Sequence, residues 1–174
     1  MGSVILQGLS QRGDGRVQAI LSRDGRTVVV GNSGVRENIT YIQVGEVKVL
    51  RWDGKKWIQK GNTIAGRSIK RFRRNSNSNT SSFFGSSVDI SMNGNVIMGG
   101  SRGFNGPSYA QAYQFNHTSS TWDLYGNELP ESTVSLSEDS KFMVGGRHRG
   151  GGYRAYALDQ RQQWETIGNP FLLQ

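Results

Sequence analysis

The chain of 174 residues contains no cysteine, which excludes disulfide bonds, thiolate metal sites and a cysteine nucleophile. No apolar run approaches the length of a membrane-spanning helix, and we expect no secretory signal in these residues. Proline is scarce at 3 residues, whereas glycine is abundant at 24. Because glycine adopts positive φ at little cost, this balance favours many tight turns over helices, and we predict an all-β chain.

Residues that carry acid–base or metal chemistry are also few. His117 and His148 are the only histidines, and neither has a partner at metal-ligand spacing. Carboxylates such as Glu128, Glu131 and Asp159 are scattered over turns without repeated pairs, although scattered carboxylates can still converge in three dimensions. We therefore predict no enzymatic activity, no bound metal and no cofactor.

One sequence motif occurs three times along the chain. The pattern W-x-x-x-G-N begins at Trp57, at Trp122 and at Trp164. Because tryptophan is rare, three frames with the same internal spacing indicate a repeated structural unit.

Each frame is preceded by a hairpin pattern of the same length. Nine positions separate a serine from a glycine in each copy, and the three serines are Ser22, Ser91 and Ser137. An Asp-Gly or Asn-Gly pair follows the serine in the first two copies, whereas Asp-Ser stands in the third. These pairs predict tight two-residue turns that connect apolar strands.

A third strand and the tryptophan-bearing strand complete each unit. We expect the third strands over residues 46–50, 111–115 and 154–158. Four short antiparallel strands per unit are typical of a β-propeller blade. The predicted fold is therefore a β-propeller-type array of about three four-stranded antiparallel blades, in one domain with units at roughly 9–62, 63–127 and 128–169.

The middle unit resembles the FG-GAP, or integrin-α-like, propeller repeats. The resemblance rests on Phe84-Gly85 and on the stretch Val88-Asp-Ile-Ser91-Met-Asn-Gly94, while the other two units lack the Phe-Gly pair. Together with three Asn-x-Ser/Thr sequons, it implies an extracellular or lumenal location. The acidic loop of the family's calcium-binding copies has no counterpart here, so we predict no calcium site.

Three blades do not make a closed ring, because propellers close with about four to eight blades. Residues Val4 to Gly8 also match the tail of a further W-x-x-x-G strand, with valine in place of tryptophan. A second copy, further residues of a longer chain or other protein subunits would each cover the open edges. We expect one of these partners and leave the choice open.

The formal net charge of +8 comes from one segment. No acidic residue lies between Asp53 and Asp89, and a Ser/Asn-rich insertion at 67–82 holds most of the cations there. We predict that an anionic partner binds this insertion and a second, glycine-rich cluster; the alternative is a solvated loop. The candidate residues are Arg67, Lys70, Arg71, Phe72, Arg73, Arg74, Arg147, Arg149 and Arg154.

The repeated tryptophans are interpreted as packing residues, and Trp52, outside the frames, as the most exposed of the four. Taken together, these patterns predict a non-catalytic interaction or scaffold module that contacts protein partners or an acidic surface. The alternatives are a lectin-like propeller that stacks sugars on Trp52 and, third, a binder of nucleic acid or another polyanion. Removal of the basic residues should abolish salt-sensitive binding under the first and third hypotheses and leave sugar binding under the second intact.

Overall fold

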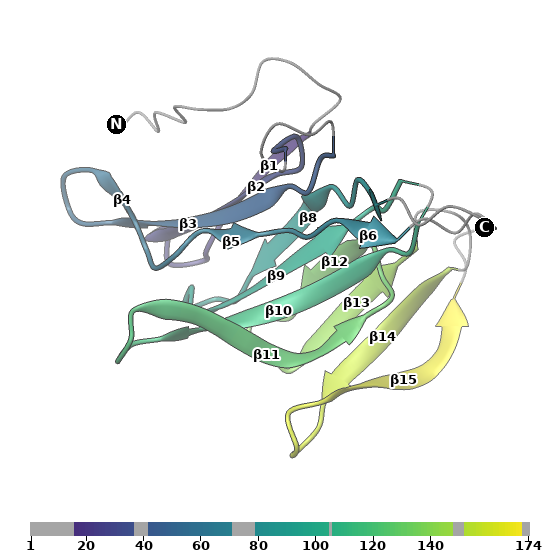
Figure 1. Ribbon diagram of the computed structural model, residues 1–174. Coiled ribbons are helices and arrows are strands. Elements are labelled where there is room, and N and C mark those ends of the chain that lie inside the picture. Colours follow the sequence, from purple (N-terminus) through teal and green to yellow (C-terminus); the bar gives the residue numbers. More distant parts are fainter. Residues whose placement is uncertain (1–15, 37–41, 71–78, 105, 148–151, 172–174) are drawn as a thin grey trace.

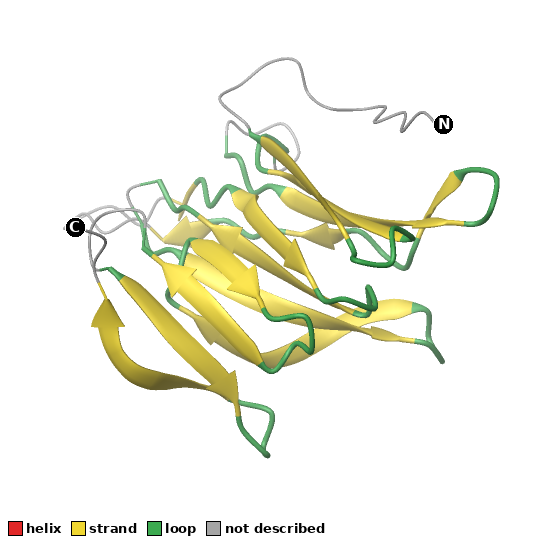
Figure 2. Cartoon of the chain, turned by 180° about the vertical axis from the view of Figure 1, so that it is seen from behind, coloured by secondary structure: helices red, strands yellow, loops and turns green. Residues whose placement is uncertain are grey.

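A computed structural model describes residues 16–36, 42–70, 79–104, 106–147 and 152–171. Within these ranges the chain forms strands and no helix, and the strands build antiparallel sheets that follow one another in chain order (Figures 1 and 2). The sheets form an open array rather than a closed ring. The predicted all-β array of four-stranded blades is therefore confirmed.

The first sheet has β1 at one edge and β4 at the other. Its strands are β1 (Val17–Leu21), β2 (Thr27–Asn32), β3 (Glu46–Trp52) and β4 (Trp57–Gln59), and β5 (Ile64–Ala65) also pairs with β3. A separate two-stranded ribbon follows, made of β6 (Ile69–Lys70) and β7 (Asn79–Thr80).

The second and third sheets have four strands each, paired in chain order. The second contains β8 (Phe84–Ile90), β9 (Val96–Ser101), β10 (Tyr109–Asn116) and β11 (Thr121–Leu129). The third contains β12 (Thr133–Leu136), β13 (Phe142–Gly146), β14 (Tyr153–Leu158) and β15 (Trp164–Phe171). Strand β8 contacts both β1 and β12, so the first strands of the sheets lie next to one another along the inner side of the array.

The three serines cap the hairpin turns in the same way. Ser22 Oγ donates to Asp24 Oδ1 at 2.6 Å and accepts the Thr27 amide at 3.0 Å. Ser91 and Ser137 repeat both bonds in their own turns. The predicted two-residue turn is wrong, because Ser22 and Thr27 close the hairpin with four residues between them. The side chains satisfy amides that the longer loop leaves unpaired.

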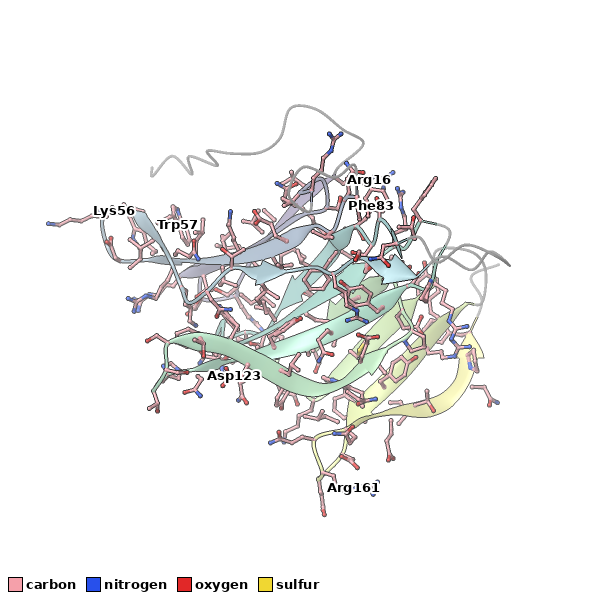
Figure 3. All side chains as sticks on the ribbon, in the orientation of Figure 1. Arg16, Lys56, Trp57, Phe83, Asp123 and Arg161 are labelled. Atoms are coloured by element: carbon pink, nitrogen blue, oxygen red, sulfur yellow. The ribbon has the colours of Figure 1, made fainter. Side chains whose placement is uncertain are left out.

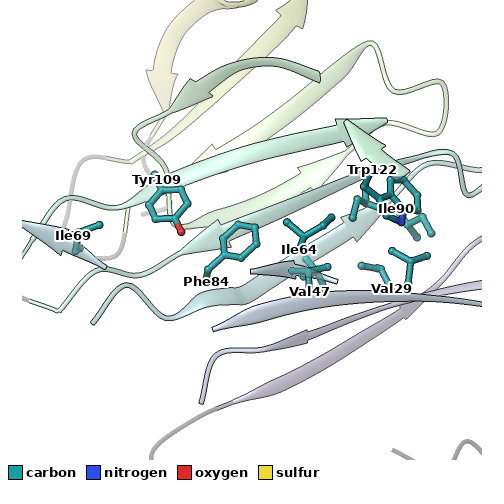
Figure 4. Packing of buried hydrophobic residues seen from close by; sticks show 11 residues of the cluster. Val29, Val47, Ile64, Ile69, Phe84, Ile90, Tyr109 and Trp122 are labelled. Atoms are coloured by element: carbon teal, nitrogen blue, oxygen red, sulfur yellow. The ribbon is translucent and has the colours of Figure 1, made fainter. Parts of the chain in front are cut away.

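The core consists of two apolar layers, each between neighbouring sheets. Val29, Val47 and Ile90 belong to the layer between the first and second sheets (Figure 4). Met98 and Met143 belong to the layer between the second and third sheets. Continuous burial of both strand faces in the middle sheet explains its runs of apolar residues.

The repeated tryptophans join one sheet to the next. Trp122 donates from its backbone amide to Asn62 Oδ1 at 2.8 Å and from its indole to the Lys60 carbonyl at 2.7 Å. Its ring lies against Gly61, where a Cβ would overlap the indole. The Gly-Asn pair of one W-x-x-x-G-N frame therefore receives the tryptophan of the following frame.

The third frame repeats this arrangement. Trp164 donates its backbone amide to Asn127 Oδ1 at 2.5 Å, and its indole packs on Gly126. Trp122 and Trp164 are both buried, as expected for packing residues.

The expectation that Trp57 is equally buried is wrong. Trp57 is only half-buried and lies beside Trp52, with ring centroids 5.6 Å apart. Its strand pairs it with Trp52 on the face of the first sheet opposite to Val49. No described sheet covers this face, so Trp57 lacks the Gly-Asn pair that buries the other two.

Candidate functional site

A pocket of about 170 Å³ lies where the inner strands begin, and we call it the axial pocket. It is lined by Arg16, Ser33, Phe83, Ser86, Arg102, Ser132 and Thr133. Arg16 directly precedes β1, Ser86 belongs to β8, and Thr133 opens β12. All three sheets therefore contribute to it, and Figure 3 shows Arg16 next to Phe83.

Serine hydroxyls hold the strand ends that shape this pocket. Ser33 Oγ accepts the Arg16 amide at 2.9 Å and donates back to the Arg16 carbonyl at 3.1 Å. Ser132 donates its amide at 2.8 Å and its hydroxyl at 2.9 Å to the carbonyl of Gly146. Because these hydroxyls are engaged by the backbone, they serve mainly to fix the pocket walls.

The charged groups of the axial pocket are two guanidinium groups. Arg16 is exposed, and Arg102 lies over the Phe83 ring at 5.4 Å from its centroid. Within the described ranges neither arginine forms an ion pair, and no carboxylate lines the pocket. Two uncompensated cations in a hollow favour an anionic ligand.

Phe83 is held in a strained conformation at the pocket wall. It is buried, and its φ is 57°. Gly85, two residues later, also has a positive φ, of 77°. A bulky residue in the left-handed region costs of the order of 1–3 kcal/mol, and such strain clusters at functional sites. The surrounding contacts, including Phe104 edge-on at 6.5 Å, hold the ring in place.

A buried carboxylate, that of Glu131, directly precedes the pocket residues Ser132 and Thr133 in the sequence. Glu131 is fully buried, and its Oε1 accepts the Tyr156 hydroxyl at 2.6 Å and the Arg154 guanidinium at 3.2 Å. Its Oε2 has no hydrogen-bond partner in the described part of the chain. Burial and the Glu131 carboxylate raise the pKa of Tyr156 to about 12, so the phenol stays protonated as the donor. A buried oxygen without a partner requires an explanation, such as a water or a ligand.

A larger cleft of about 540 Å³ lies between the first and second sheets and includes His117 and Lys60. Lys60 Nζ donates to the Gly94 carbonyl at 2.6 Å and to Asn95 Oδ1 at 2.8 Å, and burial lowers the pKa of Lys60. The His117 ring packs edge-on against Phe115 at 5.0 Å. Since the lysine is bound to backbone and amide oxygens of the neighbouring sheet, it braces the interface and is not available as a base.

Most of the predicted basic loop lies outside the described residues. This holds for Arg71, Phe72, Arg73, Arg74 and Arg149, as well as for His148 and for the predicted strand at Val4 to Gly8. Lys70 belongs to β6. Arg67 forms an ion pair with Glu128 at 2.6 Å and stacks over Tyr109 at 4.1 Å.

The second predicted cluster lies near Glu131. Arg154 is paired with it, and the exposed Arg147 is close enough for its charge to act on the Tyr156 hydroxyl. Trp52, the predicted sugar platform, is half-buried at the edge of the larger cleft.

Sequence analysis did not single out the axial pocket. Arg16 and Arg102 are isolated cations in the sequence, and no local pattern marks them. Over the described ranges, no group of three or more His, Asp or Glu side chains is arranged to hold a metal ion. The same ranges contain no helix of the length and apolarity needed to span a membrane.

No family model and no curated protein matches this chain. Solved structures do. A proposed 6-phosphogluconolactonase from Bacteroides fragilis aligns with a TM-score of 0.57 at 13% identity, over 88% of this chain and 37% of that one. A periplasmic gluconolactonase from Pseudomonas aeruginosa aligns with a TM-score of 0.55 at 16% identity, over 91% of this chain and 40% of that one.

A third structure, of a protein from Lactobacillus plantarum, aligns with a TM-score of 0.53 at 13% identity, over 88% of this chain and 40% of that one. The chain thus spans about two-fifths of the length of these neighbours. At such identities the likeness shows a shared β-propeller-like fold.

The neighbours contradict two predictions. We predicted a non-catalytic interaction module, with a lectin or a polyanion binder as alternatives, and no enzymatic activity. Two of these neighbours are named as lactonases, which are hydrolases, so the non-catalytic hypothesis is replaced. The resemblance to FG-GAP repeats stays a prediction, since no family model matches.

Proposed function

We propose that this chain is part of a lactonase-type β-propeller that hydrolyses an anionic sugar lactone at the axial pocket. The observation that carries the proposal is the pair of guanidinium groups, Arg16 and Arg102, among hydroxyl-lined strand ends. The substrate named for one neighbour, 6-phosphogluconolactone, carries a phosphate that guanidinium groups bind in a bidentate manner.

The reaction requires little from the protein. Water adds to the lactone carbonyl, the ring C–O bond breaks, the ring oxygen takes a proton, and the product is a hydroxy acid in its carboxylate form. A guanidinium group directed at the carbonyl oxygen stabilises the negative charge that develops in the tetrahedral intermediate. One arginine is assigned to this oxygen and the other to the substrate phosphate.

Glu131 is the candidate to accept the proton from the attacking water. Its Oε1 is engaged by Tyr156 and Arg154, whereas Oε2 has no partner among the described residues. A water held at Oε2 would satisfy the buried oxygen, in the residue that directly precedes Ser132 of the axial pocket in the sequence. General-base assistance of this kind contributes about 10²–10⁴-fold to the rate.

Proton release during hydrolysis of 6-phosphogluconolactone tests the proposal on the protein in its native assembly. Arg16→Gln and Arg102→Gln are each expected to lower kcat/KM about 10–100-fold, as expected for a lost charge-assisted bond of about 1.5–3 kcal/mol. Unphosphorylated gluconolactone should lose less in the variant of the phosphate-binding arginine. Lys55→Gln, an exposed cation in the β3–β4 turn, is the matched control and should leave kcat/KM unchanged.

Glu131→Gln separates the base from the binding groups. The amide keeps an acceptor for Tyr156 but does not take a proton, so kcat should fall about 10²–10⁴-fold while KM changes little. Unfolding by urea, measured in parallel, shows how much of the loss is structural. Absence of lactonase activity in the wild-type protein would refute the function, and full activity in Glu131→Gln would refute the role of this residue.

A further inference from the structure

The larger cleft between the first and second sheets lies at the opposite end of the strands from the axial pocket. Thr27, which opens β2, lines the larger cleft, whereas Ser33, which directly follows β2, lines the axial pocket. At about 3.3 Å per residue, the two hollows lie about 20 Å apart along this strand. Both walls of the larger cleft belong to described sheets, so it is a site separate from the one proposed for the lactone.

Four basic side chains from four different segments line the larger cleft. Arg26 comes from the β1–β2 turn and Arg51 from β3. Lys60 directly follows β4, and His117 belongs to the β10–β11 turn. Among the described residues that line the cleft, Asp24 has the one carboxylate. Two arginines and one lysine against this carboxylate leave a net charge of +2 before His117 is counted.

The charges of this cleft act on one another. Burial lowers the pKa of Lys60, the Arg51 guanidinium lowers it further, and Asp24 opposes the shift. Hydrogen bonds from the Ser22 hydroxyl and the Arg26 amide lower the pKa of Asp24, so this group is a carboxylate at neutral pH. The one carboxylate therefore does not balance the cations, and an anion bound among them would lower the electrostatic cost of holding them together.

Hydrogen-bond donors remain available in the cleft. Lys60 Nζ donates to the Gly94 carbonyl and to Asn95 Oδ1, which uses two of the three hydrogens of the ammonium group. Arg26 and Arg51 are exposed, and within the described ranges their guanidinium groups form no hydrogen bond or ion pair. A guanidinium group presents a planar fork of donors that matches the oxygens of a phosphate.

The interface between the second and third sheets shows that the fold does not require these cations. The strand register and the tryptophan frames place an uncharged residue at each equivalent position of that interface. These residues are Asn95 for Arg26, Gln114 for Arg51 and Tyr125 for Lys60. Because like charges gathered in one place destabilise a folded protein, three cations at the first interface alone point to a ligand that offsets them.

We propose that the larger cleft binds a small soluble ligand through a phosphate monoester group. Such a group carries a charge of about −1.5 to −2 at pH 7, which matches the net charge of +2 in the cleft. Its terminal oxygens accept hydrogen bonds from the Lys60 ammonium and from both guanidinium groups. The volume of about 540 Å³ lies within the range of about 300–1,000 Å³ that is usual for small-molecule sites. The inference concerns a second site and does not depend on the lactonase activity.

Titration with inorganic phosphate, followed by nuclear magnetic resonance, tests the inference on the whole protein. Sodium chloride keeps the ionic strength constant. The amide signals of Gly94 and Asn95 and the side-chain signal of Lys60 should shift and saturate, and the pKa of Lys60 should rise because a bound anion favours the ammonium form. Glycerol phosphate, a monoester, should bind at least as tightly as inorganic phosphate, whereas acetate, with a single charge, should bind more weakly.

The second interface supplies the substitutions for the test. Arg26→Asn and Arg51→Gln each introduce the residue that stands at the equivalent position there, so the fold should accommodate both. Each should weaken phosphate binding about 10–100-fold, as expected for the loss of a charge-assisted hydrogen bond. Lys55→Gln removes an exposed cation of the β3–β4 turn that does not line the cleft. This control should leave phosphate binding unchanged.

A double variant, Arg16→Gln with Arg102→Gln, separates the larger cleft from the axial pocket. It should lose the proposed lactonase activity and keep the phosphate-dependent shifts of Gly94 and Asn95. Three outcomes would overturn the inference: no saturable shift at these signals, a response to acetate as strong as that to phosphate, or shifts that are lost with the axial arginines and kept in both cleft variants. Phosphate binding in a protein without lactonase activity would refute the proposed function and leave this inference intact.

Discussion

The two ends of the inner strands differ in how far they repeat. At one end the serine turns after β1, β8 and β12 are built with the same hydrogen bonds in all three sheets. At the other end the connections that follow β2, β9 and β13 differ in length and sequence, covering residues 33–45, 102–108 and 147–152. The arginines of the axial pocket lie at this varied end. The repeated residues therefore determine the frame of sheets, whereas the proposed lactone site lies at the end where the connections vary.

The largest expected effect is a loss of stability at the end of the inner strands where the connections vary, if that end is tightly packed. In Gly100→Ala the new methyl group would overlap the carbonyl oxygen of Ser132, a backbone atom that does not move independently. We expect the free energy of unfolding to fall by about 3 kcal/mol or more. Gly54→Ala, with a φ of 102° and open space around it, is the control and should cost about 1 kcal/mol. Equal losses in urea titrations would contradict the packing argument.

A smaller effect should distinguish the serine turns from one another. Ser91 is fully buried, so Ser91→Ala leaves the Val96 amide without a partner and should cost about 2 kcal/mol. Ser137 is more exposed, and water can replace its hydroxyl at the Phe142 amide, so Ser137→Ala should cost less than about 1 kcal/mol. Thermal or urea unfolding checks the order, and the reverse order would contradict it.

The smallest effect concerns the acidic turns alone. Hydrogen bonds from the Ser22 hydroxyl and the Arg26 amide lower the pKa of Asp24 below 3.8, and Ser137 and Lys141 lower the pKa of Asp139 in the same way. A lowered pKa means that the stabilisation is present above the unfolded value and is lost as the pH falls through the folded value. Asn93 occupies the equivalent position in the second turn and does not titrate.

Carboxyl chemical shifts measured against pH by nuclear magnetic resonance test this assignment. In Ser22→Ala the pKa of Asp24 should rise toward its ordinary value, while that of Asp139 stays unchanged. A wild-type Asp24 pKa at or above 3.8 would show that the serine bond is absent in solution.

Sequence patterns predicted the structural features that recur in each sheet. The equal spacing from Ser22, Ser91 and Ser137 to their glycines predicted the hairpins and, with the tryptophan frames, the four-stranded open array. Burial of Trp122 and Trp164 followed from the same argument. Trp57 was the exception, because its burial depends on a preceding sheet that the described residues do not contain.

The axial pocket was not predictable in the same way. Arg16, Phe83 and Ser132 are far apart in sequence and meet only because the three inner strands begin side by side. Burial of Glu131 likewise depends on Tyr156 and Arg154 from another strand. No local period or motif encodes such long-range convergence, and the scattered carboxylates therefore gave a prediction of no catalysis.

The contact between the Gly-Asn pair of one sheet and the tryptophan of the next also follows the order of synthesis. Asn62 and Asn127, which receive a tryptophan, precede Trp122 and Trp164, which dock on them. During synthesis each receiving pair therefore emerges from the ribosome before the tryptophan that docks on it. Because each docking tryptophan lies on the last strand of its sheet, the coupling between two sheets is completed only after that strand has been synthesised.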